Sequence, residues 1–157
     1  MADVVDKATR SRMMSGIRGK NTTPEIYIRK QLHAKGLRFR LHAKTIPGHP
    51  DIVLPKYNAL ILINGCFWHG HGCKNCKTPT SNTEFWLKKI KINQQRDEIK
   101  HIQQIELGWR TLIIWECAIR ESMRQKASFD LVNIICDWLD SSSVTAHVDS
   151  SGIHLTR

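Results

Sequence analysis

Residues 63–73 read INGCFWHGHGC, and they continue an apolar run, ALILI, at residues 59–63. The apolar run predicts a buried strand. The glycines after it allow the backbone to turn tightly, and cysteine and histidine at this density are typical of a metal site. Phenylalanine and tryptophan side by side in such a turn are costly to leave in water without a function. We therefore expect this segment to be the functional centre around which the fold is built.

The composition indicates one domain of 157 residues, long enough to bury about two-thirds of its unfolded surface. Lysine and arginine number 24 against 14 acidic residues, a net charge of +10. This excess favours a polyanionic partner, although a basic protein without such a partner has the same composition. Five cysteines, three of them within residues 66–76, argue against a disulfide framework and favour reduced thiols, some bound to zinc.

Local patterns predict a mixed α/β order of elements. Thr22 and Pro24 open a helix that Gly36 ends. A long helix begins at a capping-box pattern, residues 81–84, and reaches about Glu106. The other predicted elements are strands at residues 37–41, 52–54, 59–63 and 110–115, and a last helix at about 128–139. The serine run and the tail after it are left unassigned.

Two of these predictions position side chains. The strands at 52–54 and 59–63 are joined by a short turn, so they should form a hairpin that places Asp51 and Asn64 at neighbouring ends of the sheet. The long helix carries two stripes at helical spacing. One is apolar and the other more polar: Phe85, Ile92, Ile99 and Ile102, and Trp86, Ile90, Asn93 and Asp97.

Residues 1–22 are basic, with apolar residues interspersed. The pattern favours an arm that lies on phosphates and offers apolar tips to bases, although a short surface helix has the same composition. The residues concerned are Lys7, Arg10, Arg12, Arg18 and Lys20, with Met13, Met14 and Ile17 between them.

The Pro50-Asp51 pair at the start of a strand has the outline of the magnesium nuclease signature PD…(D/E)xK. Hydrolysis of a phosphodiester needs a hard cation, and magnesium takes one or two carboxylates and leaves its other positions to water and substrate. Aspartate after proline is also common in turns. The place of the second half of the signature is occupied by Asn64-Gly65-Cys66, so the signature alone does not assign a nuclease.

The cysteine and histidine cluster is the stronger motif. A loop holding Cys66, His71, Cys73 and Cys76, joined to Cys117 after a distant strand, would form a closed structural zinc site. The alternative is that Cys117 and Cys136 are ordinary buried cysteines, which we prefer for Cys136 alone. Cys76 could be a spare thiol or an alternative ligand.

Phe67, Trp68 and Trp86 could be core residues, as most aromatic residues are. The first two are adjacent within a glycine-flanked turn, where both can hardly be buried. Aromatic wedges in a duplex cost a few kcal/mol of unstacking per step, and this cost is lowest at a mismatched pair.

Together these motifs resemble the very short patch repair (Vsr) endonucleases, a family that nicks DNA beside the thymine of a T/G mismatch. The resemblance runs in order through nearly the whole chain, and its most specific block is Gly65-Cys66-Phe67-Trp68-His69. The other segments that carry it are residues 7–11, 18–20, 23–25, 47–51, 83–97, 108–117 and 152–155.

The resemblance implies a magnesium-dependent endonuclease that hydrolyses the phosphodiester 5′ to the mispaired thymine. It also implies an α/β, restriction-endonuclease-like fold of the PD-(D/E)xK type, with a central mixed sheet flanked by helices and a zinc-pinned loop. Residues 1–22 would be a DNA-clamping arm and residues 23–157 the endonuclease domain.

The same resemblance implies roles for individual residues. Asp51 and the backbone carbonyl of Ile63 would hold Mg²⁺, and His69 would act as general base or acid. Asp97 and Glu25 would support the catalytic site. Structural zinc would be bound by Cys66, His71, Cys73 and Cys117. DNA would be wedged by Phe67, Trp68 and Trp86 and clamped by the arm through Met14, Arg10, Arg12, Arg18 and Lys20.

Position 64 departs from the family pattern, because it is usually histidine or aspartate and here it is Asn64. The amide can coordinate or hydrogen-bond through its oxygen, but it brings no charge and cannot shuttle protons. We keep Asn64 in the catalytic set, with two alternatives: a mismatch-binding zinc module with impaired catalysis, or another sequence-specific nicking endonuclease of the same fold. A basic zinc protein that binds RNA or undamaged DNA would leave Asp51, His69 and Asp97 without a role.

The sequence shows neither the apolar core of a signal peptide nor a segment of transmembrane length. We therefore expect a cytoplasmic protein with no membrane partner. The family resemblance implies a bacterial monomer that acts on double-stranded DNA of the nucleoid, with repair proteins as candidate partners.

Overall fold

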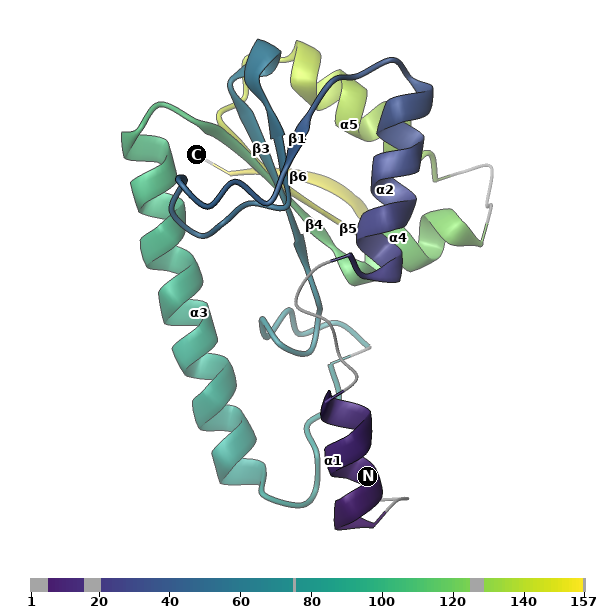
Figure 1. Cartoon of the computed structure of the whole chain (residues 1–157), viewed down its shortest axis with the longest axis vertical. Coiled ribbons are helices and arrows are strands. Elements are labelled where there is room, and N and C mark those ends of the chain that lie inside the picture. The colour runs from purple at the N-terminus through teal and green to yellow at the C-terminus, as the bar shows by residue number, and fades with distance from the viewer. Residues whose placement is uncertain (1–5, 16–20, 75, 125–128, 157) are drawn as a thin grey trace.

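A computed structural model of the chain describes residues 6–15, 21–74, 76–124 and 129–156 (Figure 1). The helices are α1 (Lys7–Ser15), α2 (Thr23–Ala34), α3 (Thr83–Glu106), α4 (Glu116–Met123) and α5 (Leu131–Asp140), with a 3₁₀ turn at Pro55–Tyr57. The strands are β1 (Arg40–Leu41), β2 (Ile52–Leu54), β3 (Ala59–Asn64), β4 (Arg110–Trp115), β5 (Thr145–Asp149) and β6 (Gly152–Thr156). No helix within the described residues is long and apolar enough to cross a membrane.

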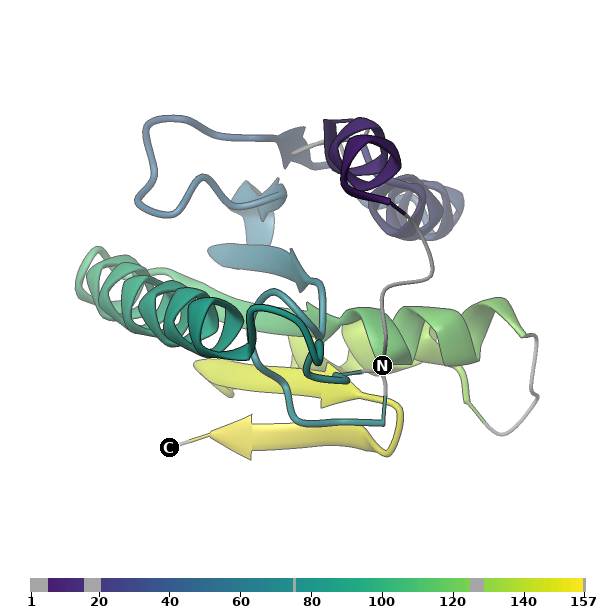
Figure 2. The same cartoon turned by 90° about the horizontal axis from the view of Figure 1, so that it is seen from below.

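The strands form one mixed sheet in the order β1-β2-β3-β4-β5-β6. β3, β4 and β5 run parallel to one another, and the other neighbours pair antiparallel. Figure 2 shows the strands following one another from β1 to the yellow β6, with α3 on one side of the sheet and α4 on the other. The predicted α/β fold with a central mixed sheet between helices is confirmed.

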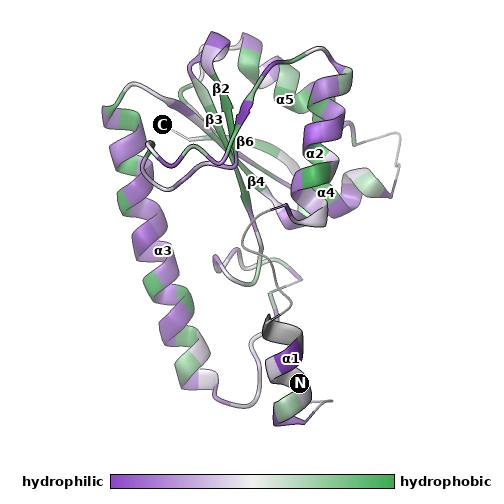
Figure 3. Cartoon of the chain, in the orientation of Figure 1, coloured by the Kyte–Doolittle hydropathy of each residue, from purple (hydrophilic) through white to green (hydrophobic). Residues whose placement is uncertain are grey.

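The main core lies between the sheet and the helices α2, α4 and α5. Alternate residues of the central strands point into it, among them Ile61 of β3 and Leu112 and Ile114 of β4, all fully buried. They meet Leu32, Ile119 and Ile135 from the three helices. Figure 3 shows these strands as the most hydrophobic part of the chain, whereas α1 and much of α3 are hydrophilic. Burial at about 25 cal/mol per Å² of apolar surface makes this layer the main source of stability.

The sequence predictions for the start of α2, for the hairpin and for the central strands agree with the structure. Thr22 caps α2, because its hydroxyl accepts the backbone N–H of Glu25. The strands at 52–54 and 110–115 have the predicted bounds, and β3 is one residue longer than predicted. β2 and β3 pair antiparallel as a hairpin.

Other predictions were wrong in their extent. The strand at 37–41 is reduced to Arg40–Leu41, which pair with only two residues of the short β2. The last helix begins at Leu131 instead of about residue 128, because Asp130 supplies the cap by accepting the N–H of Asn133. The sequence analysis did not identify α4, β5 or β6, which occupy residues it had left without an element.

The long helix α3 begins and ends as predicted but is not capped as predicted. Asn82 precedes it with a φ of +53° and makes no side-chain capping bond, and the Thr83 hydroxyl donates instead to the Pro79 carbonyl at 2.8 Å. The more polar stripe faces the loop that follows β3. The apolar stripe is exposed to solvent, with Phe85 59% and Ile99 55% accessible.

Arg110, at the start of β4, ties the sheet to the end of α5. Its guanidinium donates to five backbone carbonyls, those of Tyr57, Trp138, Leu139, Ser141 and Ser143, at 2.7–3.4 Å. Its central carbon also lies 4.4 Å from the centre of the Trp138 ring. These contacts join segments that are far apart in the sequence.

The substitution Arg110→Met is therefore expected to lower the free energy of unfolding by about 2–4 kcal/mol, since it leaves partly buried carbonyls without donors. Urea denaturation at equilibrium measures the change. Arg120→Met is the matched control, because Arg120 is exposed and forms an ion pair with Glu116 on the surface of α4, and it should cost less than about 1 kcal/mol. Equal losses in the two variants would contradict the bridging role of Arg110.

Candidate active site and metal centre

The end of β3 brings Asp51 and Asn64 together, as the hairpin prediction required. Asp51 precedes β2, and its Oδ2 accepts the backbone N–H of Ile63 at 2.8 Å. Asn64 is the last residue of β3 and is buried, with 8% of its surface exposed. The strand end thus fixes the Asp51 carboxylate by a backbone donor that no side-chain change can remove.

Glu25 faces Asp51 from the first turn of α2, where it is 4% exposed. Its Oε2 accepts the backbone N–H of Asn21 and a guanidinium N–H of Arg29, both at 2.9 Å. His42 completes this group, since ligand atoms of Glu25, His42 and Asp51 lie within 4.8 Å of one another. The group can therefore bind a cation between two carboxylates and an imidazole.

The sequence analysis did not identify His42 and Arg29 as site residues. His42 Nε2 lies 2.8 Å from Arg29 Nη2, and the His42 backbone N–H donates to the Asp51 carbonyl at 3.3 Å. His42 has a φ of +48°, in the left-handed region that few residues other than glycine adopt. Neither its spacing nor its neighbours in the sequence signal this position, because it depends on pairing between β1 and β2.

The pKa of Asp51 is raised from 3.8 to about 6. Burial is the largest cause, the Ile63 N–H opposes the rise, and the nearby Glu25 carboxylate adds to it. A nearby cation stabilises the ionised form of a buried carboxylate, and carboxylate oxygens are ligands that suit magnesium. The residues present therefore fit a divalent cation at Asp51.

This pKa predicts how the stability of the magnesium-free protein depends on pH. Because folding raises the pKa of Asp51, the folded state binds more protons than the unfolded state between pH 3.8 and about 6. The contribution is present below pH 3.8 and is lost as the pH rises through about 6, up to about 3 kcal/mol in all. Urea unfolding across this range, with wild type compared with Asp51→Asn, measures it as the difference between the two proteins. A pH-independent difference would contradict the prediction.

His69 and Asp97 form the second part of the site. His69 Nδ1 lies 2.5 Å from Asp97 Oδ2, which joins the loop after β3 to the polar stripe of α3. Two further side chains of α3 donate hydrogen bonds to the same loop: Asn93, from the more polar stripe, and its neighbour Gln94. Asn93 donates to the Trp68 carbonyl at 2.9 Å, and Gln94 donates to the Gly70 carbonyl at 3.2 Å. The loop that carries His69 is therefore held by three polar contacts within little more than one turn of α3.

Gly70 is needed for this close approach. It has a φ of +61°, and a Cβ at this position would lie 2.4 Å from Gln94 Nε2 and 2.8 Å from Ile90 Cγ2. Only glycine accepts this backbone conformation without strain and leaves the space that α3 occupies.

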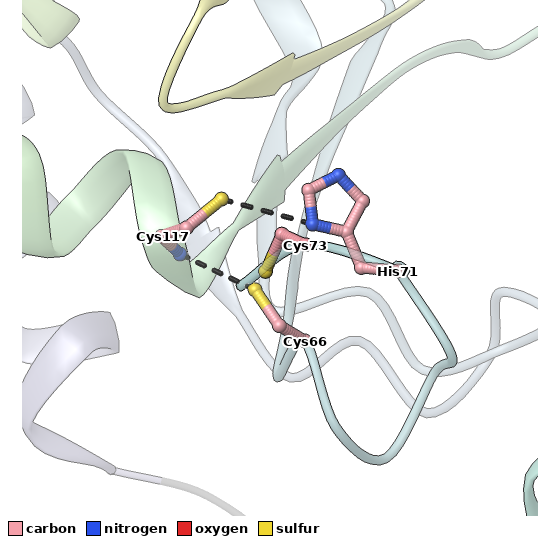
Figure 4. Close-up of side chains that lie close together, drawn as sticks. All are labelled: Cys66, His71, Cys73 and Cys117. Atoms are coloured by element: carbon pink, nitrogen blue, oxygen red, sulfur yellow. Dashed lines mark hydrogen bonds between the residues drawn. The ribbon is translucent and has the colours of Figure 1, made fainter. Parts of the chain in front are cut away.

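The predicted zinc ligands converge at the start of α4 (Figure 4). Ligand atoms of Cys66, His71, Cys73 and Cys117 all lie within 4.8 Å of one another. Cys66 and Cys117 are buried, and the Cys117 backbone N–H donates to Cys66 Sγ at 3.4 Å. Three sulfurs and one imidazole nitrogen are a donor set typical of structural zinc. Burial raises the pKa of the Cys66 thiol, so a thiolate there needs the positive charge that a metal ion would supply.

His71 is oriented from both sides. Its Nδ1 lies 3.7 Å from Cys117 Sγ, and its Nε2 lies 3.6 Å from Asp149 Oδ2 at the end of β5. Its ring also stacks on Trp115, with centroids 4.2 Å apart. A carboxylate behind a ligating histidine is the usual arrangement around zinc.

Cys76 lies outside the four-residue group. Its thiol donates to the Cys66 carbonyl at 2.9 Å and lies 3.8 Å from Cys73 Sγ. Of the two alternatives for Cys76, this position favours the spare thiol over the zinc ligand. Cys136 is half-buried on α5, away from the cluster, in keeping with the structural interpretation preferred for it.

The aromatic residues gather beside the loop. Phe67, Trp68 and Trp86 have ring centroids 5.2–5.7 Å apart, and Phe85 contacts Trp86 at 5.2 Å. Phe67, Trp68 and Trp86 are each partly exposed. They form a cluster at the start of α3, and this end of the helix lies on the side of α1 in Figure 1.

The basic N-terminal segment contains α1, which lies apart from the sheet (Figure 1). Lys7 and Arg12 are exposed on this helix. Arg10 and Met14 belong to this helix, but their side chains are not described. Arg18 and Lys20 lie outside the described residues. The clamping role predicted for residues 1–22 therefore stays a prediction.

Comparison with known proteins connects this geometry with DNA cleavage. The sequence model of the family described as DNA mismatch endonuclease Vsr matches residues 2–75. The chain is 43% identical to DNA mismatch endonuclease Vsr of Escherichia coli K12 over 159 residues, which cover 99% of both chains. It is also 41% identical over 121 residues to the type II nicking enzyme V.XorIIP of Xanthomonas oryzae, covering 77% of this chain and 89% of that enzyme. A similar nicking enzyme, V.NmeAIP of Neisseria meningitidis, is 43% identical over 121 residues, covering 76% and 86% of the two chains.

Proposed function

Because the chain belongs to the Vsr family of DNA mismatch endonucleases, we propose that it nicks duplex DNA at a T/G mismatch in very short patch repair. The bond hydrolysed is the phosphodiester 5′ to the mispaired thymine. The observation that carries the proposal is the presence of two groups of titratable side chains, one beside the end of β3 and one in the loop that follows it. These are Asp51 with Glu25, and His69 with Asp97.

In this proposal, Asp51 and the backbone carbonyl of Ile63 hold Mg²⁺. When bound, the ion supplies a positive charge that polarises the scissile phosphate and lowers the pKa of the attacking water. Glu25 supports the site from α2, where Arg29 and the Asn21 N–H keep its carboxylate in place.

His69 transfers the proton. Since Asp97 accepts a hydrogen bond from Nδ1, the proton of the neutral imidazole lies on Nδ1 and Nε2 is available as a base. The imidazole and the carboxylate are both partly accessible to solvent. A substrate can therefore reach them without rearrangement of α3.

The remaining groups bind and position DNA. Structural zinc held by Cys66, His71, Cys73 and Cys117 would fix the loop to α4. Phe67, Trp68 and Trp86 would enter the base stack at the mismatch, where unstacking costs least. The basic segment at residues 1–22, with Arg10, Arg12, Met14, Arg18 and Lys20, would clamp the duplex. We propose a monomer, with other repair proteins as partners.

The test is single-turnover cleavage of a labelled duplex that contains one T/G mismatch, with the matched T/A duplex beside it. Each duplex is incubated with magnesium and in buffer freed of divalent ions, and the zinc content is measured in both to exclude loss of zinc. Magnesium-dependent cleavage of the mismatched thymine strand alone is the expected result. Equal cleavage of the matched duplex would indicate a sequence-specific nicking enzyme instead of a mismatch-specific one.

A second candidate function follows from Asn64, which is buried at the end of β3 and carries no charge. Tight mismatch binding without a nick would indicate a recognition module with impaired catalysis. Asn64→His separates this case from a misassigned site, because restored cleavage in that variant would locate the defect at position 64. No cleavage in either protein would refute the proposed catalytic set.

A further inference from the structure

Cys73 and Cys76 form a close pair of thiols in the loop between β3 and α3. Their sulfurs lie 3.8 Å apart, and the Cys76 backbone N–H donates to the Cys73 carbonyl at 2.9 Å. A turn closed in this way keeps its end Cα atoms less than about 7 Å apart, near the range that a disulfide needs. The sulfurs must approach by about 1.8 Å to bond, so the loop itself need not refold.

Only one of these two thiols belongs to the zinc group. Cys73 lies within 4.8 Å of the other three ligand atoms, whereas the Cys76 thiol donates to the Cys66 carbonyl at 2.9 Å. A tetrahedral site has no place for a fifth ligand. Cys76 is thus a thiol within reach of a zinc ligand, and the site already described does not use it.

Cys73 and Cys76 are also more accessible to solvent than Cys66 and Cys117. Cys73 and Cys76 are half-buried in a surface loop beside the exposed Gly72, Lys74 and Lys77, whereas Cys66 and Cys117 are buried. Small oxidants act on accessible thiols first, and an adjacent second thiol captures the oxidised sulfur as a disulfide. Oxidation of this zinc site should therefore begin at residues 73 and 76.

We propose that Cys73 and Cys76 form a reversible disulfide when the protein meets a peroxide, and that this bond releases zinc. One thiol attacks the peroxide oxygen, so an S–O bond forms, the O–O bond breaks, and a first water leaves. The second sulfur displaces the hydroxyl of the sulfenic acid, which leaves as a second water after taking a proton. In sum, two thiols are oxidised by two electrons to one disulfide, and one hydrogen peroxide is reduced to two waters.

Loss of zinc would also affect the proposed catalytic residue His69. Loss of Cys73 leaves three ligands, and the loop that these ligands attach to α4 also carries His69. Oxidation then switches off nicking, and a dithiol reductant with zinc restores it. This step rests on the zinc assignment of the proposed function, whereas formation of the disulfide does not.

The experiment uses the zinc-loaded full chain without DNA, treated with a small excess of hydrogen peroxide. Zinc release is followed with a chromogenic chelator, and disulfides are mapped by mass spectrometry after non-reducing digestion. Cys76→Ser is the test variant, and Cys136→Ser is the matched control. The wild type and Cys136→Ser are expected to form the 73–76 disulfide and to release zinc roughly tenfold faster than Cys76→Ser.

Two results would overturn the inference: a disulfide that joins other cysteines, or zinc release from Cys76→Ser at the wild-type rate. The zinc content before oxidation distinguishes failure of the disulfide proposal from failure of the zinc assignment. A protein purified without zinc refutes the zinc site, and the disulfide map of that protein still decides whether residues 73 and 76 pair.

Discussion

Asp51→Asn is expected to reduce single-turnover nicking of a T/G duplex by roughly 10³-fold or more, because it removes the carboxylate charge that would hold magnesium. The amide keeps the shape of the side chain. Burial already favours the neutral form of Asp51, since it raises the pKa of the carboxyl to about 6. The variant should therefore fold at least as well as the wild type, and lost activity reports on chemistry.

Binding of the mismatched duplex should stay within a few-fold of the wild type, because the proposed wedge is formed by Phe67, Trp68 and Trp86 and does not include Asp51. Gel-shift titration in calcium and the nicking assay in magnesium measure the two effects separately. Asp137→Asn is the matched control, since Asp137 is an exposed carboxylate on α5 that no part of the proposed mechanism uses. Nicking by Asp51→Asn at the rate of this control would refute the assignment of the active site.

The second large effect concerns the zinc group. Cys117→Ser is expected to abolish stoichiometric zinc binding and to lower the free energy of unfolding by several kcal/mol, since zinc sites in small peptides contribute about 10 kcal/mol. Cys117 is 3% exposed and, as a ligand, would attach the loop to α4. Nicking should fall with stability, because the same loop carries His69.

Metal analysis and urea unfolding with and without added zinc test this prediction. The unfolding midpoint of the wild type should depend on zinc, and that of Cys117→Ser should not. Cys136→Ser, at a half-buried cysteine outside the cluster, should keep the zinc dependence of the wild type. One bound zinc in Cys117→Ser with unchanged stability would show that position 117 is not a ligand.

The sequence predicted those parts of the fold that local patterns determine. The strand at 52–54 is apolar throughout, the strand at 110–115 contains the apolar run 112–115, and Thr22 with Pro24 is a local helix start, so each was placed from its own residues. A metal site was predicted because a glycine-rich loop concentrates cysteine and histidine and Cys117 follows a recognisable strand, whereas the choice of four ligands came from the family resemblance. The family resemblance supplied the grouping of His69 with Asp97, which spacing alone does not give.

The parts that were missed depend on contacts between distant segments. α4 begins directly after β4 with no side-chain cap, so no local signal separates the two elements. β5 and β6 are defined by pairing with β4 and with each other. His42 reaches Asp51 only because β1 pairs with β2. Helical spacing identified the apolar stripe of α3, but spacing does not say whether another element covers it.

The loop after β3 carries a consequence for protein engineering. Phe67 and Trp68 directly precede His69 and lie between the proposed ligands Cys66 and His71, so redesign of these two rings would also disturb the proposed acid–base group and metal site. Trp86 stands on α3, a separate and continuous helix, and touches both rings at 5.6 and 5.7 Å. Attempts to broaden or shift the lesion preference of the enzyme should therefore begin with libraries at Trp86 and its exposed neighbour Phe85, where shape can vary without altering turnover chemistry.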